Sequence, residues 1–324
     1  MSIIEKAVDK LEQKVAASQE REDEEAVIDY SPVQPLDEVK IEKTSSQNLG
    51  DNELTAEDST TVESDAEENK KEQVIDLPIA RINSLGMVSP DLPRSKIAEE
   101  FRAIKRPLLT NIAGEGAVAV DNANLILVSS ALAGEGKTFS AINLAMSLAM
   151  EQDKTVLFVD ADVSKATATH FLGIADNQKG LIDILQNDHV KIGDVLLHTN
   201  IPNLKVLPAG HAHDRPTELL ASDNMRALML ELSRRYSDRV IVFDSPPLLQ
   251  TTEAAVLANL VGQIVLVVAA NETPQAAVTE AIEHIRDDKV IGLLLNKSNG
   301  RDSGQYGYGY GYGYGYGGRE RAED

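Results

Sequence analysis

The chain has 324 residues, of which 42% are hydrophobic and 26% are charged, so it contains enough apolar material for a full core. It has no cysteine, which excludes a disulfide framework, a thiolate zinc site and a cysteine nucleophile. Its net charge of −21, without any basic run, argues against nucleic acid as the main partner.

The first 77 residues hold most of the negative charge, with 8 Lys or Arg against 22 Asp or Glu. Within residues 1–16, apolar residues recur at helical spacing from Ile4 to Val15, which predicts an amphipathic helix. This helix would dock either on the protein's own surface or on another polypeptide. Residues 17–77 are acidic, rich in Ser and Thr and aperiodic, and are therefore expected to form a disordered linker.

The start of the chain, MSIIEKAVDKLEQK, is too charged for a secretory signal, and no run of about 18 uncharged apolar residues follows it. We therefore expect a cytoplasmic protein. Its folded domain is predicted over residues 78–298. Residues 299–324 contain YGYGYGYGYGYGG, in which alternate glycines remove packing partners, so this tail is expected to be flexible.

The folded domain shows strands and helices in alternation. Residues 95–112 have helical periodicity, and Pro107 is expected to kink or split that helix. Nearly continuous apolar runs, typical of strands covered on both faces, lie at 124–130, 155–160, 204–210, 239–244, 263–270 and 290–296. Helical patterns lie between them, at 138–150, 180–187, 217–235, 252–260 and 274–287. The alternation predicts an α/β fold with a doubly wound, mostly parallel sheet, in which ligands bind at the carboxyl ends of the strands.

The segment Ala131-Leu-Ala-Gly-Glu-Gly-Lys-Thr138 follows the first of these strands and opens a helix, the context that a phosphate-binding loop requires. Gly134 and Gly136 let backbone N–H groups turn inward around a phosphate, and the helix N-terminus adds about half a positive charge. Lys137 would reach the β- and γ-phosphates, and the Thr138 hydroxyl would be a ligand of Mg²⁺. The strict pattern has glycine where Ala131 stands, and the alternative interpretation is an ordinary turn between a strand and a helix.

Three acidic residues follow or end predicted strands. In VLFVDAD, Asp160 and Asp162 are separated by one residue and can point to the same side. In VIVFDSPP, Asp244 has the form of a Walker B acid that holds a metal through water. Each residue alone is compatible with a helix cap or a turn. Beside a phosphate-binding loop, the three acids together indicate a Mg²⁺–nucleotide site and a fold of the P-loop NTPase type.

The order of GEGKT, VDAD and FDSPP resembles that of the bacterial tyrosine kinases (BY-kinases) of exopolysaccharide export. The resemblance continues through GLIDIL, LPAG, PTELL and the terminal tyrosine cluster, and covers roughly residues 95–318. The arrangement is most similar to the soluble, exosortase-associated tyrosine autokinases, whose membrane activator is a separate chain. Partitioning and cell-division ATPases of the same clan carry a signature lysine near the start of the loop, and the stretch 131–133 holds none.

This resemblance implies roles for individual residues. Lys137 would be catalytic, with Thr138, Asp160 and Asp244 as the metal site. Asp162 is the candidate base, or orienting group, for the incoming tyrosine hydroxyl. The expected nucleotide-binding residues are Ala133, Gly134, Glu135, Gly136, Lys137, Thr138, Phe139 and, as an adenine contact, Asn296.

Glu99, Arg102 and Lys105 resemble the Glu-x-x-Arg-x-x-Arg motif through which the family forms rings. Because Lys105 replaces an arginine, it lacks the bidentate fork of a guanidinium group. Ser164 stands where the family usually has a basic residue after the second Asp, with Lys165 next to it.

The resemblance implies an ATP-dependent protein tyrosine autokinase that phosphorylates its own tail and regulates exopolysaccharide chain length or export. Mg²⁺ is the expected cofactor, and a membrane-embedded chain-length-determinant adaptor is the expected activator, which would recruit the chain to the inner face of the cell membrane. Each phosphate adds nearly two negative charges, which we expect to loosen a ring. The expected acceptors are Tyr306, Tyr308, Tyr310, Tyr312, Tyr314 and Tyr316.

Two other functions are compatible with a phosphate-binding loop. One is a partitioning- or division-type P-loop ATPase, which positions partner proteins through nucleotide-switched dimerisation. The absent signature lysine and the tyrosine tail count against it. The other is a non-catalytic scaffold that binds ATP and uses its Gly/Tyr tail for assembly. The three acids count against the scaffold, which does not need all of them.

Overall fold

The computed structural model of the chain describes one folded domain. The expected helix over 1–16, the linker up to residue 73 and the tyrosine tail lie outside the described residues. The domain begins before the expected boundary at residue 78, because Val74–Ile75 already pairs with another strand of the sheet. The described residues are 74–175, 177–187, 189–234 and 238–298.

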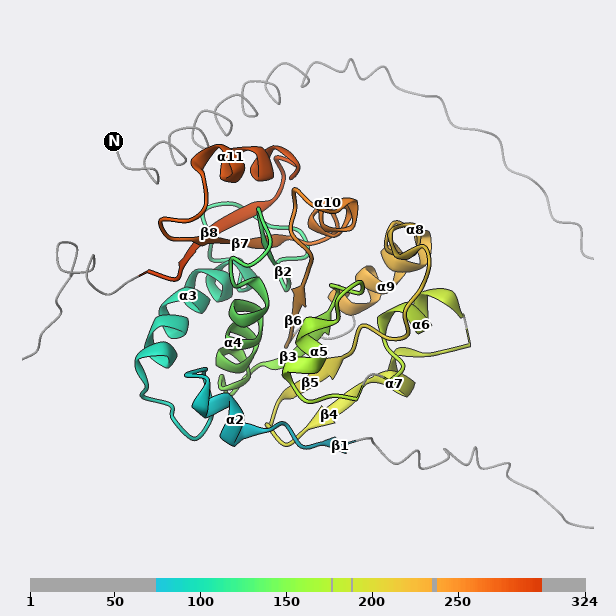
Figure 1. Cartoon of the computed structure of the whole chain (residues 1–324), viewed down its shortest axis with the longest axis horizontal. Coiled ribbons are helices and arrows are strands. Elements are labelled where there is room, and N and C mark those ends of the chain that lie inside the picture. The colour runs from blue at the N-terminus through green and yellow to red at the C-terminus, as the bar shows by residue number, and fades with distance from the viewer. Residues whose placement is uncertain (1–73, 176, 188, 235–237, 299–324) are drawn as a thin grey trace, which may run out of the picture. The chain divides into compact units, whose positions relative to one another are not determined.

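Eight strands of the described residues form one sheet, in the order β1-β4-β5-β3-β6-β2-β7-β8 (Figure 1). All neighbouring strands are parallel except β4 and β5. From β2 the chain runs outward to β3 and β5, returns to β6, and continues past β2 to β7 and β8. This reversal is that of a doubly wound fold and confirms the expected fold class. The strands are β1 (Val74–Ile75), β2 (Leu125–Ser130), β3 (Thr155–Asp160), β4 (Leu197–Thr199), β5 (Leu204–Leu207), β6 (Arg239–Asp244), β7 (Gln263–Ala269) and β8 (Val290–Asn296).

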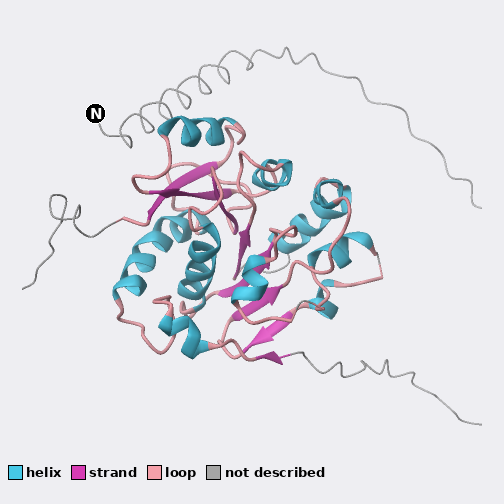
Figure 2. Ribbon diagram, in the orientation of Figure 1, coloured by secondary structure: helices cyan, strands magenta, loops and turns pink. Residues whose placement is uncertain are grey.

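Helices cover both faces of the sheet (Figure 2). They are α2 (Ile79–Ser84), α3 (Lys96–Ile112), α4 (Lys137–Ala149), α5 (Thr167–Phe171), α6 (Leu181–Gln186), α7 (Ile192–Val195), α8 (Pro216–Leu220), α9 (Asp223–Arg234), α10 (Thr252–Ala258) and α11 (Gln275–Glu283). Figure 1 shows α3 and α4 on one side of the central strands, and α9 and α10 on the other. In the described part of the chain, no helix combines the length and the apolar character needed to cross a membrane.

The central strands are buried on both faces, which explains their nearly unbroken apolar sequences. Every residue of β2 is buried. Because alternate residues of a strand point to opposite faces, Ile126 and Val128 pack in the core with α3 and α4, whereas Leu125 and Leu127 pack in the core with α9 and α10. The sheet thus separates two cores and holds its strand ends in fixed positions.

Two helices differ from the sequence-based expectation. The predicted helix over 217–235 is two helices, α8 and α9, because the Ser222 hydroxyl accepts a hydrogen bond from the Met225 N–H (3.2 Å) and starts a new helix. Conversely, the sequence predicts that Pro107 kinks or splits its helix, and the proline does not split it, because α3 continues through Pro107 as one helix. Phe101 and Leu108 are buried on the two sides of the proline, and their packing keeps the helix continuous.

Candidate active site

The expected site residues come together at the carboxyl ends of three adjacent strands. Asp160 ends β3 and Asp244 ends β6, and their Cα atoms are register partners in the parallel pair. Val128 of β2 is paired with Asp244 from the other side, and the loop 131–136 follows β2 directly. The sheet order therefore places both acids beside the phosphate-binding loop.

The loop has the backbone conformation of a phosphate cradle. Gly134 and Gly136 adopt φ angles of 83° and 96°, the left-handed region that favours glycine. At Gly136 a Cβ atom would lie 2.0 Å from the side-chain nitrogen of Asn296, so a larger residue would require that side chain to move. Gly136 is also the N-cap of α4 and provides no side chain to its first N–H groups, which leaves them available for an anion.

Lys137 and Asp162 form a buried ion pair. The Lys137 ammonium donates a hydrogen bond to Oδ2 of Asp162 at 2.8 Å. Lys137 is 9% exposed and Asp162 is 1% exposed. The sequence places the lysine at the start of α4 and the acid two residues after β3. The pair therefore joins the loop after β2 to the end of β3, which is separated from β2 by β6.

Asp160 and Asp244 are completely buried, and three of their four carboxylate oxygens make no hydrogen bond within the described residues. Oδ2 of Asp160 is the exception, because it accepts from the Thr169 N–H (2.9 Å) and the Thr169 hydroxyl (2.7 Å). Burial without partners is costly for an ionised carboxyl. A bound cation near these oxygens would offset that cost.

Burial raises the pKa of Asp244 to about 8, an effect that the positive charge of Lys137 opposes and the carboxyl of Asp160 reinforces. The Thr138 hydroxyl also lowers this pKa, although it lies outside hydrogen-bonding geometry. Burial likewise raises the pKa of Asp160, against the hydrogen bonds from Thr169. A cation at this place would favour the charged form of both acids.

These residues fit a magnesium ion that is bound together with a nucleotide. Their unpartnered carboxylate oxygens are the hard ligands that Mg²⁺ prefers. The described residues contain no group of three or more His, Cys, Asp or Glu side chains able to hold a metal by themselves. Mg²⁺ typically uses one or two carboxylates and completes its shell with water and substrate phosphates, so two acids and the Thr138 hydroxyl suffice.

Glu135 fastens the loop to the edge of the sheet formed by β7 and β8. Its carboxylate accepts hydrogen bonds from the Leu132 N–H (2.6 Å) and the Thr273 hydroxyl, and its carbonyl accepts from the Asn296 side chain (2.8 Å). The Thr273 hydroxyl also accepts from the Ala269 N–H (3.1 Å), at the end of β7. The buried carboxylate of Glu135 therefore binds the loop itself and Thr273, and holds the loop in position.

Thr273 and Thr169 are functional candidates that sequence reasoning missed. Thr169 lies in α5, nine residues after Asp160, and Thr273 lies after β7, 138 residues from Glu135. Neither residue belongs to a sequence motif that marks it. Of the remaining expected nucleotide-binding residues, Ala133 is exposed in the loop, and Phe139, in the first turn of α4, is partly buried against the core. Ser164 and Lys165 are both exposed after Asp162.

The three residues of the expected ring motif do not share one exposed face. Glu99 and Arg102 form an ion pair at the surface of α3. Lys105 is 4% exposed, and its ammonium contacts the Ser147 carbonyl (2.5 Å) and the Glu151 carboxylate (2.7 Å). In this structure Lys105 joins α3 to the end of α4, and its expected part in oligomerisation stays a prediction.

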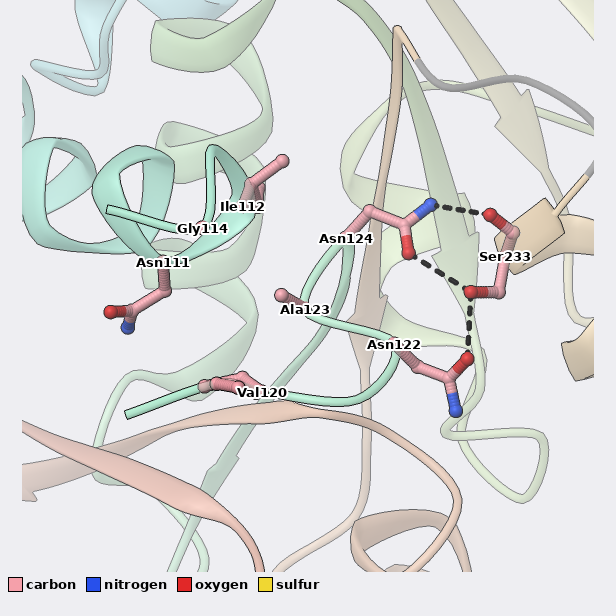
Figure 3. Close-up of a pocket in the computed structure, with 9 residues that line it drawn as sticks. Asn111, Ile112, Gly114, Val120, Asn122, Ala123, Asn124 and Ser233 are labelled. Atoms are coloured by element: carbon pink, nitrogen blue, oxygen red, sulfur yellow. Dashed lines mark hydrogen bonds between the residues drawn. The ribbon is translucent and has the colours of Figure 1, made fainter. Parts of the chain in front are cut away.

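A pocket of about 380 Å³ lies at the opposite, amino-terminal end of β2 (Figure 3). Ser233 donates hydrogen bonds there to the side-chain oxygens of Asn122 (2.8 Å) and Asn124 (3.1 Å). The pocket's lining residues carry no charge and do not suit a triphosphate. They are Asn111, Ile112, Gly114, Ala119, Val120, Asn122, Ala123, Asn124 and Ser233.

Known proteins are similar to this chain in sequence and in fold. Residues 123–290 match the family described as AAA domain. The chain is 32% identical over 217 residues to the tyrosine-protein kinase YwqD of Bacillus subtilis (strain 168). This alignment covers 66% of this chain and 87% of YwqD. It is 33% identical over 232 residues to the succinoglycan biosynthesis transport protein ExoP of Rhizobium meliloti (strain 1021), covering 68% of this chain and 28% of ExoP.

The crystal structure of the chimerical protein CapA2B2 has the same fold, with a TM-score of 0.57 and 28% identity over 70% of this chain and 93% of the chimera. The fold carries a phosphate-binding loop and implies ATP binding. Together with the identity to YwqD, it shows that the chain is a protein-tyrosine kinase and belongs to the family of bacterial tyrosine-protein kinases.

Proposed function

We propose that the chain is an autokinase that transfers the γ-phosphate of Mg²⁺-ATP to tyrosines of its own C-terminal cluster, residues 306–316. The observation that carries the proposal is the convergence of Lys137, Asp160, Asp162 and Asp244 at one end of the sheet. Phosphoryl transfer depends mainly on positioning and charge stabilisation, and this cluster offers both.

Lys137 and Asp162 would work as an exchangeable pair. In the structure the ammonium is neutralised by the Asp162 carboxylate at 2.8 Å. A triphosphate in the loop would compete for the ammonium and release the carboxylate. The tyrosine oxygen would then form a bond to the γ-phosphorus, the bond to the ADP oxygen would break, and Asp162 would accept the hydroxyl proton.

Asp160, Asp244 and Thr138 would hold the magnesium ion. When bound, Mg²⁺ offsets the negative charge of the phosphates. The unpartnered oxygens of the two acids support this assignment, and the hydrogen bonds from Thr169 would keep Asp160 oriented. On the other side of the loop, Glu135 and Thr273 would hold the cradle in place, with Asn296 at the adenine end.

The relative ExoP is named for succinoglycan biosynthesis and transport, which supports a role for this chain in regulating exopolysaccharide chain length or export. A membrane-embedded adaptor would activate the chain and recruit it to the inner face of the membrane, as the expected docking helix over 1–16 allows. A ring would use Glu99 and Arg102, whose side chains lie at the surface of α3, without a direct contribution from Lys105.

The test is incubation of the purified chain with Mg²⁺-ATP, followed by mass spectrometry of residues 299–324 and measurement of released phosphate. We expect tail phosphotyrosine in the wild type, none in Lys137→Met, and wild-type labelling in Lys191→Met, which removes an exposed lysine. An adaptor's cytoplasmic segment is included in a parallel reaction. Steady hydrolysis without phosphotyrosine in both reactions would instead favour the partitioning-type ATPase, and neither activity would favour the scaffold.

A further inference from the structure

Strand β8 is an open edge of the sheet. Among the described strands it pairs only with β7, through the register from Gln263–Val290 to Ala269–Asn296. Its sequence, VIGLLLN, contains no charge and no proline, the devices that usually protect an edge from pairing. The lysines that flank it, Lys289 and Lys297, are each ion-paired, with Asp288 and Glu272 respectively.

The outward-facing backbone groups of β8 belong to its odd-numbered residues. The Val290 N–H donates to Gly262 and the Asn296 carbonyl accepts from Ala270, so the even-numbered residues turn their backbone toward β7. Ile291, Leu293 and Leu295 therefore present N–H and C=O groups at the edge that no other described strand pairs with.

The same odd-numbered residues leave apolar surface uncovered. The side chains of Leu293 and Leu295 are 39% and 58% exposed, whereas Ile291 on the same face packs partly against the core with α11. Alternate residues share a face, so the two exposed leucines form a continuous apolar strip along the strand. This strip and the edge backbone groups together suit an added strand with large side chains on one face.

The segment that leaves β8 has that pattern. From Tyr306 to Gly317 the sequence alternates tyrosine and glycine, and residues 304–318 carry no charge. A period of two places every ring on one face of an extended chain. Lys297 has a φ of 57°, so the chain turns away directly after β8, and Asn299-Gly300 is a dipeptide that favours a tight turn.

We propose that the chain's own tail adds to the edge of β8 as an antiparallel strand, with tyrosine rings over Leu293 and Leu295. Residues 297–305 are long enough to reverse the direction of the chain. Glycine lowers the strand propensity of the tail, but the covalent link gives the tail a high effective concentration at this edge. The proposal goes beyond the autokinase activity and does not need it, because it rests only on the edge of β8 and the sequence of the tail.

The first test is amide hydrogen exchange of the full chain without nucleotide, compared with a chain that ends at Ser303. We expect the N–H groups of Ile291, Leu293 and Leu295 to exchange about threefold or more slowly in the full chain. Gly292 and Leu294 bond to β7 in both proteins and are internal references. Equal exchange of the three edge amides in the two chains would overturn the proposal.

The second test uses the absence of native cysteine. In the full chain, Leu293→Cys is combined in turn with cysteine at positions 306, 307, 308, 309 and 310, and the rate of intramolecular disulfide formation is measured. We expect faster bonding from the tyrosine positions than from the glycine positions between them, because only the former share the face of Leu293. A smooth dependence on position, or bonds that form only between two copies, would refute docking of the chain's own tail.

Discussion

Replacement of Asp244 by asparagine removes the ionisable group of the site that has the fewest hydrogen bonds among the described residues. Both carboxylate oxygens are buried without a hydrogen bond among the described residues, and burial raises the pKa to about 8 from an ordinary value of 3.8. Between these two values the folded chain keeps a proton that the unfolded chain has released. The free energy of unfolding of the nucleotide-free chain therefore falls as the pH rises through this range.

The size of the effect follows from the shift. Each pH unit in this window removes about 1.4 kcal/mol, so at pH 7 the buried acid costs about 4 kcal/mol relative to a group that does not titrate. Water that enters the site on ionisation reduces this value, and we expect about 2–4 kcal/mol. Asparagine resembles the protonated acid in shape and does not ionise, so Asp244→Asn removes the cost.

The assay is urea unfolding at several pH values between about 4 and 8 without nucleotide. We expect Asp244→Asn to be more stable than the wild type at pH 8 and nearly equal to it near pH 4. Asp153→Asn, at an exposed position, is the matched control and should leave the pH profile unchanged. Parallel pH profiles for the wild type and Asp244→Asn would refute the reasoning about the buried acid.

Three further predictions concern the loop and α3. Thr273→Val removes the hydroxyl that binds Glu135, and should weaken ATP binding about 2- to 10-fold while Thr273→Ser restores it, as measured by titration calorimetry. Glu151→Gln leaves the buried Lys105 ammonium without its carboxylate and should cost about 1–3 kcal/mol in urea unfolding, more than Lys105→Met. Because Lys105 lowers the pKa of Glu151, the stability that this carboxyl contributes should disappear as the pH falls below 4.5, and in Lys105→Met that acid-dependent loss should be smaller. An unchanged ATP affinity in Thr273→Val, or equal costs for Glu151→Gln and Lys105→Met, would contradict the assigned contacts.

The sequence predicted the position of the acids because the geometry of parallel sheets leaves few alternatives. Asp160 and Asp244 end apolar strands, and carboxyl ends of parallel strands meet at one edge of a sheet. Lys137 and the glycines occupy a strand-to-helix turn whose backbone conformation is local. The fold class and the convergence of these residues could therefore be deduced from runs of a few residues.

Tertiary contacts decided what the sequence could not reveal. Lys105 lies on the predicted helix, but its burial depends on where α4 ends and on Glu151, 46 positions later. Thr273 contacts the loop from a turn 138 residues away, and no local pattern marks it. Pro107 is tolerated within α3 because the residues around it pack on the core, which overrides the local tendency to break the helix.

The central claim is that the loop and the acids form one magnesium–triphosphate site. Binding of Mn²⁺, a spectroscopic substitute for Mg²⁺, can be followed by electron paramagnetic resonance with and without ATP. The account predicts one ion per chain that binds tightly only with nucleotide, and that is lost in both Asp244→Asn and Lys137→Met. Tight, nucleotide-dependent binding that persists in Asp244→Asn would contradict it.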